Sequence, residues 1–165
     1  MKFFELGYRI ILIGHKNHPE VIGTMGQLPS GSIELVETVS DVMKLSINDN
    51  DNFAYLTQTT LSLDDTKKII EALKVRLPKI ISSPKEDICY ATSNRQKAIK
   101  EYAQMCDAFI VVGSSNSSNS NRLVEVAKNA GCENSILLEN EDNLNVKDYE
   151  PVSYTHLRAH ETGYN

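Results

Sequence analysis

The chain has 165 residues and a formal net charge of −5 at pH 7, a length that suits one domain or two small ones. The acidity argues against nucleic acid or an anionic membrane as a partner, because both favour a basic face. No apolar run approaches the ~20 residues that span a bilayer, and the N-terminus lacks a secretory signal. We therefore expect a cytoplasmic protein.

Five short apolar runs predict β-strands, and amphipathic stretches alternate with them. The runs cover residues 9–14, 32–36, 53–57, 108–112 and 135–138. Several are almost continuously apolar, as in Ile10-Ile11-Leu12-Ile13, which is typical of parallel strands covered on both faces. This alternation predicts the α/β class, with three-layer-like lobes and mostly parallel sheets.

The amphipathic stretches predict six helices, most of them with a capping or stop signal. The expected helices run up to Leu6 before Gly7, over 19–27, over 39–44, from a cap at Ser62, from a cap at Thr92, and from 117–119 to Gly131. The best-marked start is Ser62, with Asp65 three residues later. Ser, Thr and Asn side chains at such places satisfy free backbone N–H groups.

The residues 81–85 predict a linker between two α/β halves, 1–83 and 84–150. Each half has fewer strands than the ~5–6 of an ordinary sheet, so we expect part of the protein to be missing or supplied by another chain. The residues 151–165 show neither helix nor strand period. They resemble translated sequencing-adaptor read-through and are predicted to be a non-native tail.

The three cysteines are Cys89, Cys106 and Cys132, an odd number that argues against a disulfide framework in a chain without a secretion signal. Cys106 and Cys132 are predicted to be structural, because buried free cysteine is common on apolar helix faces and at helix ends. Cys89 is followed by polar residues and lies on no helical face. By itself it is a nucleophile, a metal ligand or a packing residue.

Three polar loops, 14–20, 57–62 and 113–122, each follow a predicted strand and precede a predicted helix. Free N–H groups at a helix start bind anions, and ligands of open α/β sheets bind at the carboxyl ends of the strands. Together the loops would suit a phosphate or diphosphate, although each taken alone could be mere capping. His18 and Glu20, two residues apart at a helix start, could act in proton transfer.

Four strings, 11–27, 57–62, 87–96 and 112–123, occur in the order and with the spacing of one family. They are Ile-Leu-Ile-Gly-His-Lys-Asn-His-Pro-Glu-Val-Ile-Gly-Thr-Met-Gly-Gln, Thr-Gln-Thr-Thr-Leu-Ser, Asp-Ile-Cys-Tyr-Ala-Thr-Ser-Asn-Arg-Gln and Val-Gly-Ser-Ser-Asn-Ser-Ser-Asn-Ser-Asn-Arg-Leu. Over residues 1–148 the chain resembles the 4-hydroxy-3-methylbut-2-enyl diphosphate reductase (LytB) family. The family fold is three α/β domains in a pseudo-threefold arrangement around a central [4Fe–4S] cluster. The resemblance implies that this chain covers two of these domains in part.

The resemblance also implies roles for single residues. Cys89 matches one of three thiolates that hold the cluster. Glu20 matches the acid that supplies protons for loss of the substrate hydroxyl, and Thr59 matches the hydroxyl beside that acid, which relays or orients the proton. His18 matches a diphosphate-binding histidine that also helps in proton delivery.

Further residues match the family's diphosphate pocket. Thr60 follows Thr59 in that pocket, and Ser117, Ser118 and Asn119 match the serine-rich binding loop. The implied reaction is a two-electron reductive dehydroxylation in isoprenoid biosynthesis that gives isopentenyl and dimethylallyl diphosphates. Ferredoxin or flavodoxin would deliver the electrons, in the cytoplasm or, for a plant or alga, in the plastid stroma.

Two of the three cluster cysteines have no match in this chain, which therefore resembles an internal fragment. We expect the isolated chain to be inactive and unable to hold a stable cluster, because one thiolate cannot replace three. The alternative reading is an α/β module that binds a phosphorylated metabolite without redox chemistry.

Overall fold

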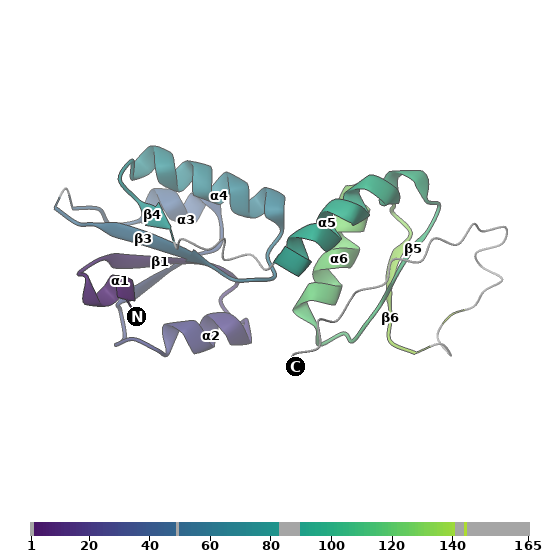
Figure 1. Ribbon diagram of the computed structural model, residues 1–165, viewed down its shortest axis with the longest axis horizontal. Coiled ribbons are helices and arrows are strands. Elements are labelled where there is room, and N and C mark those ends of the chain that lie inside the picture. The colour runs from purple at the N-terminus through teal and green to yellow at the C-terminus, as the bar shows by residue number, and fades with distance from the viewer. Residues whose placement is uncertain (1, 49, 83–89, 141–143, 145–165) are drawn as a thin grey trace. The chain divides into compact units, whose positions relative to one another are not determined.

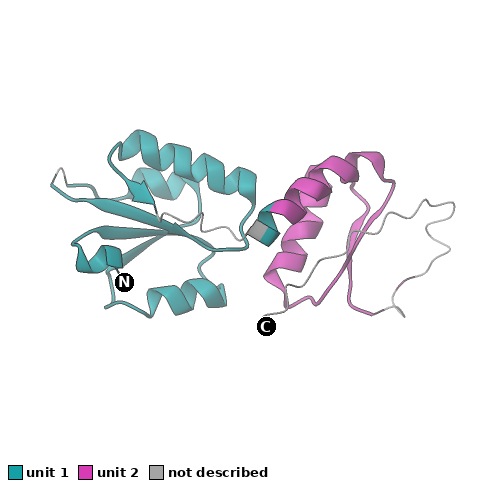
Figure 2. Ribbon diagram, viewed as in Figure 1, with its two compact units in different colours: residues 1–93 teal, residues 94–165 magenta. Residues whose placement is uncertain are grey.

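The computed structural model describes residues 2–48, 50–82, 90–140 and 144. The chain forms two compact units, Met1–Ser93 and Asn94–Asn165, each described below by itself (Figure 2). The predicted boundary after residue 83 and the predicted tail 151–165 both lie outside the described residues, so the assignment of the halves to family domains stays a prediction.

The first unit is built on a four-stranded parallel sheet in the order β2-β1-β3-β4. Its strands are β1 Arg9–Ile13, β2 Ile33–Val36, β3 Phe53–Thr57 and β4 Ile81–Ser82. The sheet confirms the predicted α/β class and the first three predicted strands. The first two residues of the predicted linker 81–85 form β4 instead, because Ile81 pairs with Ala54 at the edge of β3. Residues 83–85 lie outside the described residues.

Four helices belong to this unit, and Figure 1 shows α3 and α4 on one face of the sheet with α2 on the other. They are α1 Lys2–Glu5, α2 Pro19–Met25, α3 Val39–Lys44 and α4 Leu63–Arg76. The predicted cap at Ser62 is confirmed, since its side chain accepts a hydrogen bond from the Asp65 backbone. A second cap had not been predicted: Thr38 and Asp41 form a reciprocal capping box at the start of α3.

Strand β1 is buried on both of its faces, as its continuous apolar run predicts. Ile11 and Ile13 pack with the core beneath α3 and α4. Ile10 and Leu12 pack with Val21 of α2 in a separate cluster. Because successive side chains of a strand point to opposite faces, an uninterrupted apolar run gives each face its own core.

In its described residues, the second unit contains two parallel strands and the helices packed on them (Figure 1). Its elements are α5 Tyr90–Tyr102, which begins in the first unit, the 3₁₀ turn η1 Ala103–Met105, β5 Phe109–Val112, α6 Ser118–Asn129 and β6 Ser135–Leu138. The core joins Ile99 and Ala103 to the buried face of α6 and to Val111. Both predicted strands of this unit and the predicted final helix are confirmed.

Two details bear on the sequence predictions for α5 and for the cysteines. Thr92 was predicted to cap α5, but the helix already includes Tyr90, and Thr92 is a buried residue within it. Its side chain therefore does not stand at the start of the helix. Cys132 is buried in the core and Cys106 packs against it, which confirms that both cysteines are structural.

In the part of the chain that the structure describes, no helix has the length and apolar character needed to cross a bilayer.

Candidate functional site

The strand ends of the first unit bring two of the three predicted loops together. Ile13, the last residue of β1, pairs with Thr57, the last residue of β3. Parallel strands in this register end at the same edge of the sheet, so the loops that follow them start side by side. Residues 14–18 and 58–62 therefore form one neighbourhood.

The central contact of this neighbourhood joins Glu20 to Thr59, residues that are far apart in the sequence. The Thr59 backbone N–H donates to Glu20 Oε1 at 3.0 Å, and the Thr59 hydroxyl donates to Glu20 Oε2, also at 3.0 Å. Both side chains are half-buried. Because both carboxylate oxygens accept from one residue, the carboxylate is held in a fixed orientation beside a hydroxyl, an arrangement that suits transfer of a proton.

His18 is the N-cap of α2, and its Nδ1 accepts a hydrogen bond of 3.2 Å from the Glu20 backbone N–H. The predicted pairing of imidazole with carboxylate is therefore not a direct bond, because the Glu20 carboxylate is turned to Thr59. An accepting Nδ1 carries no proton, so the neutral ring carries its proton on Nε2. The cap thus leaves His18 with an N–H donor on the other side of the ring.

Gln58 is a site residue that the sequence analysis missed. Its side chain is almost fully buried, and its Oε1 accepts from the His15 backbone N–H at 3.0 Å. Its Nε2 donates to Thr60 Oγ1 at 3.0 Å within its own loop. Gln58 therefore links its own loop to the loop that contains His15. A glutamine between two threonines carries no signal of burial, so only the strand register reveals this role.

Glycine is needed at position 14, because Val21 of α2 and the side chain of Gln58 both pack close to this backbone. A Cβ at this position would lie 2.6 Å from Val21 Cγ2 and 3.2 Å from Gln58 Oε1. The first distance is shorter than real Cβ contacts and the second is tight, so a side chain here would force Val21 to shift and Gln58 to give way slightly.

The third predicted loop lies in the second unit, between β5 and α6. Ser117 is the N-cap of α6, and its hydroxyl accepts from the Ser120 backbone N–H at 3.3 Å. Ser118 and Asn119 form the first turn of that helix and are half-buried. Ser117 thus serves as a cap, which is one of its two predicted roles. It also lies at the N-terminus of a twelve-residue helix, where backbone N–H groups favour an anion.

Asn119 has a buried side-chain oxygen with no hydrogen-bond partner among the described residues. An unpaired buried polar atom costs free energy that a partner would recover. A half-turn of the amide exchanges that oxygen for two N–H donors, so the group can serve either a donor or a phosphate oxygen.

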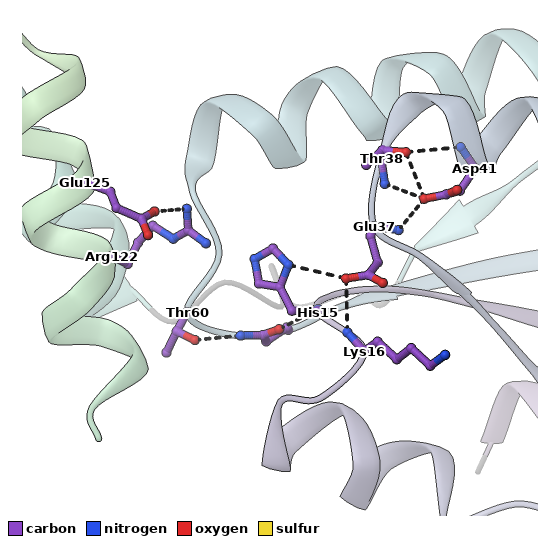
Figure 3. A network of polar contacts seen from close by, with 9 residues as sticks. His15, Lys16, Glu37, Thr38, Asp41, Thr60, Arg122 and Glu125 are labelled. Carbon is purple, nitrogen blue, oxygen red and sulfur yellow. Dashed lines mark hydrogen bonds and ion pairs between the residues drawn. The ribbon is translucent and has the colours of Figure 1, made fainter. Parts of the chain in front are cut away.

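A carboxylate follows the neighbouring strand in each unit. Glu37 comes directly after β2 and accepts from the Lys16 backbone N–H at 3.1 Å, and His15 Nδ1 lies 3.7 Å from the same oxygen (Figure 3). Glu139 comes directly after β6 and accepts from the Ser115 backbone N–H. That backbone bond holds the pKa of Glu139 below its ordinary value, with the Ser115 and Ser114 hydroxyls adding to the effect.

The opposite end of the first sheet has a different character. Arg9 at the start of β1 pairs with Glu34 and with Asp51, the latter at 2.7 Å, and its guanidinium lies 5.0 Å from the ring centre of Phe53. These bonds keep the pKa of Arg9 above and that of Asp51 below the ordinary values. Every charge here has a partner within the unit, which is typical of a structural network.

The described residues contain no ligand set for a metal cluster. No group of three or more His, Cys, Asp or Glu side chains in residues 2–48, 50–82, 90–140 and 144 is placed to hold a metal ion. Cys106 donates to the Tyr102 carbonyl, and Cys132 is enclosed by the core. Cys89, the predicted cluster ligand, lies outside the described residues.

The family model described as LytB protein matches residues 1–159 of the chain. A relative from Ruegeria sp. (strain TM1040), named 4-hydroxy-3-methylbut-2-enyl diphosphate reductase, is 53% identical over 155 residues, which are 94% of this chain and 49% of the relative. A relative of the same name from Ruegeria pomeroyi is 55% identical over 149 residues, covering 90% of this chain and 47% of its own length. The chain thus spans about half the length of the curated relatives it matches.

The solved structures agree with these relatives. A structure of the E-1-hydroxy-2-methyl-but-2-enyl-4-diphosphate reductase from Plasmodium falciparum aligns with a TM-score of 0.83 and 43% identity, covering 89% of this chain and 46% of that one. A structure titled as the terminal enzyme of the non-mevalonate pathway aligns with a TM-score of 0.52 and 30% identity, covering 88% of this chain and 51% of that one. Matched along nearly its whole sequence, the chain belongs to the LytB protein family.

Proposed function

We propose that this chain supplies part of the active site of a 4-hydroxy-3-methylbut-2-enyl diphosphate reductase, an oxidoreductase of isoprenoid biosynthesis. Its relatives carry that name, and the chain spans about half of their length. The observation that carries the proposal is the Glu20–Thr59 pair, which places a carboxyl group and a hydroxyl in one fixed hydrogen-bonded unit at the carboxyl edge of a parallel sheet.

The proposed reaction breaks the carbon–oxygen bond of an allylic alcohol. Two electrons and two protons are consumed, the hydroxyl leaves as water, and a new carbon–hydrogen bond gives isopentenyl or dimethylallyl diphosphate. We assign Glu20 as the proton source and Thr59 as the group that passes or orients the proton. The hydrogen bond between them supports this assignment, because an acid must lie within hydrogen-bond reach of the group it protonates.

The diphosphate would be bound by side chains that this chain holds at two loop ends. His18 offers its Nε2–H, since Nδ1 is occupied by the cap. Thr60 lies in the same neighbourhood, held by Gln58. In the second unit Ser117, Ser118 and Asn119 occupy the start of α6, where backbone N–H groups and the helix dipole favour an anion.

The electrons would come from ferredoxin or flavodoxin through a [4Fe–4S] cluster for which Cys89 supplies one thiolate. This part of the proposal rests on the resemblance alone, because the described residues contain no cluster ligand set. On the same basis we propose a cytoplasmic enzyme, or a stromal one in a plant or alga.

A chimeric enzyme tests the proposal. Residues 1–148 of this chain replace the corresponding half of the Ruegeria sp. reductase, and reduction of 4-hydroxy-3-methylbut-2-enyl diphosphate is measured under anaerobic conditions with a chemical reductant. We expect an active chimera whose turnover is lost in Glu20→Gln and in Thr59→Ala. A chimera that folds, holds its cluster and shows no turnover would contradict the proposal.

The non-redox alternative predicts a different result. A phosphometabolite-binding module would bind inorganic diphosphate as the isolated chain, lose binding in the Ser117→Ala, Asn119→Ala double variant, and keep it in Cys89→Ala. The reductase reading expects no stoichiometric cluster on the isolated chain after anaerobic reconstitution with iron and sulfide. Visible absorbance and iron analysis decide that point.

A further inference from the structure

The loops after β1 and β5 share a backbone pattern at an offset of 99 residues in the sequence. Gly14 donates to the Val36 carbonyl at 3.1 Å, and Gly113 donates to the Leu138 carbonyl at 3.0 Å. Each acceptor is the last residue of the neighbouring parallel strand, in the same register. The two loops therefore leave their sheets in the same way.

The loops also close in the same way. The His18 N–H donates to the His15 carbonyl at 2.9 Å, and the Ser117 N–H donates to the Ser114 carbonyl at 2.9 Å. Each turn ends on the N-cap residue of the following helix, with an extended backbone at the cap. The proposed binding side chains thus stand at equivalent places.

A single carboxylate contacts the middle of each turn. Glu37 accepts from the Lys16 N–H, two residues after Gly14 (Figure 3). Glu139 accepts from the Ser115 N–H, two residues after Gly113. Both carboxylates directly follow the strand that accepts from that glycine. Glu37 is itself fixed, because its backbone N–H donates to Asp41 Oδ2 of the α3 capping box at 3.3 Å.

We propose that Glu37 and Glu139 are equivalent positioning residues, each of which holds the turn that presents the binding side chains of its unit. The inference rests on the proposed function for what those side chains bind. A bond from an N–H to a charged oxygen is stronger than one between neutral groups, so one carboxylate can order a short polar turn. Neither residue touches the substrate; each acts through the backbone of its loop.

The charge of the carboxylates makes the inference testable. A negative charge near the loop repels a diphosphate, so loss of the charge alone would strengthen binding. Weaker binding after removal of the carboxylate therefore reports the loss of the hydrogen bond. Glutamine keeps an acceptor oxygen and removes the charge, so Glu→Gln separates the two effects and Glu→Ala removes both.

The experiment uses the full chain labelled with ¹⁵N. In the unmodified protein, the amide protons of Lys16 and Ser115 should shift as Glu37 and Glu139 become protonated, and these shifts should vanish in Glu37→Gln and Glu139→Gln. Titration of His15, whose ring faces Glu37, is followed separately through its ring signals. In Glu37→Ala and Glu139→Ala, exchange of the same amide should become roughly ten- to a hundredfold faster, and in the Gln variants it should change by less than about threefold.

Exposed glutamates in each unit are the controls, Glu71→Ala on α4 and Glu101→Ala on α5. The positioning role is overturned if the amide protons of Lys16 and Ser115 do not shift as Glu37 and Glu139 are protonated. It is also overturned if the Ala variants change the amide exchange rates no more than the controls do, or if the Gln variants raise those rates as much as the Ala variants.

Inorganic diphosphate is then titrated into the chimeric enzyme that carries residues 1–148, with the same variants made in it. Affinity about tenfold weaker in Ala and no weaker in Gln supports the inference, and equal affinity in Ala contradicts it. Absence of binding by the unmodified chimera contradicts the proposed diphosphate role of these loops, while the amide signals of the full chain still decide whether Glu37 and Glu139 position them.

Discussion

The loop after β1 and the loop after β5 have the same backbone bonds but different side-chain partners. In the first unit β1 is flanked by strands on both sides, and the loop is bonded to residues that follow each of them. In the second unit the described part of the sheet pairs β5 with β6 alone. The loop there is bonded toward β6 through Glu139 and back to α6 through Asn121.

This difference is visible at the second residue of each helix. Glu20 finds Thr59 on the loop after β3, and both carboxylate oxygens are satisfied. Asn119 stands at the equivalent place, and its buried oxygen has no partner among the described residues. The shared backbone pattern thus fixes the position of the side chain. Whether the side chain finds a hydrogen-bond partner depends on a second neighbouring strand, which is β3 in the first unit.

The largest effect on the kinetics is expected from substitutions at these two equivalent positions. In the chimeric enzyme, Glu20→Gln should lower kcat by ~10²–10⁴-fold, the usual contribution of a general acid. Asn119→Ala should mainly raise KM, because we assign it to binding. Steady-state kinetics measure both, with the exposed Glu71→Gln as control. An Asn119→Ala variant that loses kcat at unchanged KM would show that the two positions do not divide chemistry and binding.

Alanine at either of the two loop glycines should destabilise its unit. Gly14→Ala is expected to lower the free energy of unfolding by roughly 1–3 kcal/mol, because the new methyl group meets both the buried Val21 and Gln58. Gly113→Ala is expected to cost a similar amount, because the new methyl group would clash with Ser120 Oγ and lie 3.0 Å from Ser120 Cβ. Urea unfolding measures the change in each unit.

Gly23→Ala is the matched control for the glycine variants. It lies inside α2 with nothing within 4 Å of an added Cβ and should gain about 0.5–1 kcal/mol from helix propensity. If Gly14→Ala behaves like Gly23→Ala, the close approach of α2 to the strand end is not a constraint.

The caps should show a smaller effect. Ser117→Ala removes the bond to Ser120 and should cost α6 about 1 kcal/mol, as loss of an N-cap usually does. His18→Asn should keep α2 stable, because asparagine also caps, while it raises KM in the chimera by removing the ring N–H. Hydrogen exchange of the helix amides measures the caps, with the exposed Ser40→Ala as control.

The smallest expected effect concerns pH. The folded pKa of Glu139 is lowered by its bond to Ser115, so this bond stabilises the folded unit fully above the unfolded pKa. Its contribution should be lost as the pH falls from the ordinary glutamate value through the folded pKa. Comparison of acid unfolding between the unmodified chain and Glu139→Gln measures it. Identical acid profiles would show that the bond does not persist in solution.

Much of the fold was predictable because it depends on local patterns. The continuous apolar run of β1 predicted a doubly covered parallel strand, and Ser62 followed by Asp65 predicted the start of α4. Predictions failed where a partner far along the chain decided the outcome. Ile81 lies in a strand because it pairs with Ala54 at the edge of β3. Thr92 lies inside α5 because that helix already includes Tyr90.

The sequence by itself determined the α/β class, the order of the elements and the family, since these are written in periodicity and in strings of adjacent residues. It also indicated that the three polar loops together would suit a diphosphate, and the family resemblance placed Thr59 beside Glu20. Only the tertiary structure showed that both Glu20 carboxylate oxygens bond Thr59 while His18 bonds the Glu20 backbone. It alone also showed that Gln58 joins two loops, and that Glu37 and Glu139 occupy equivalent places. The physical reason is strand register: residues 39 or 43 positions apart meet because parallel strands end at one edge of a sheet, and no local pattern encodes that meeting.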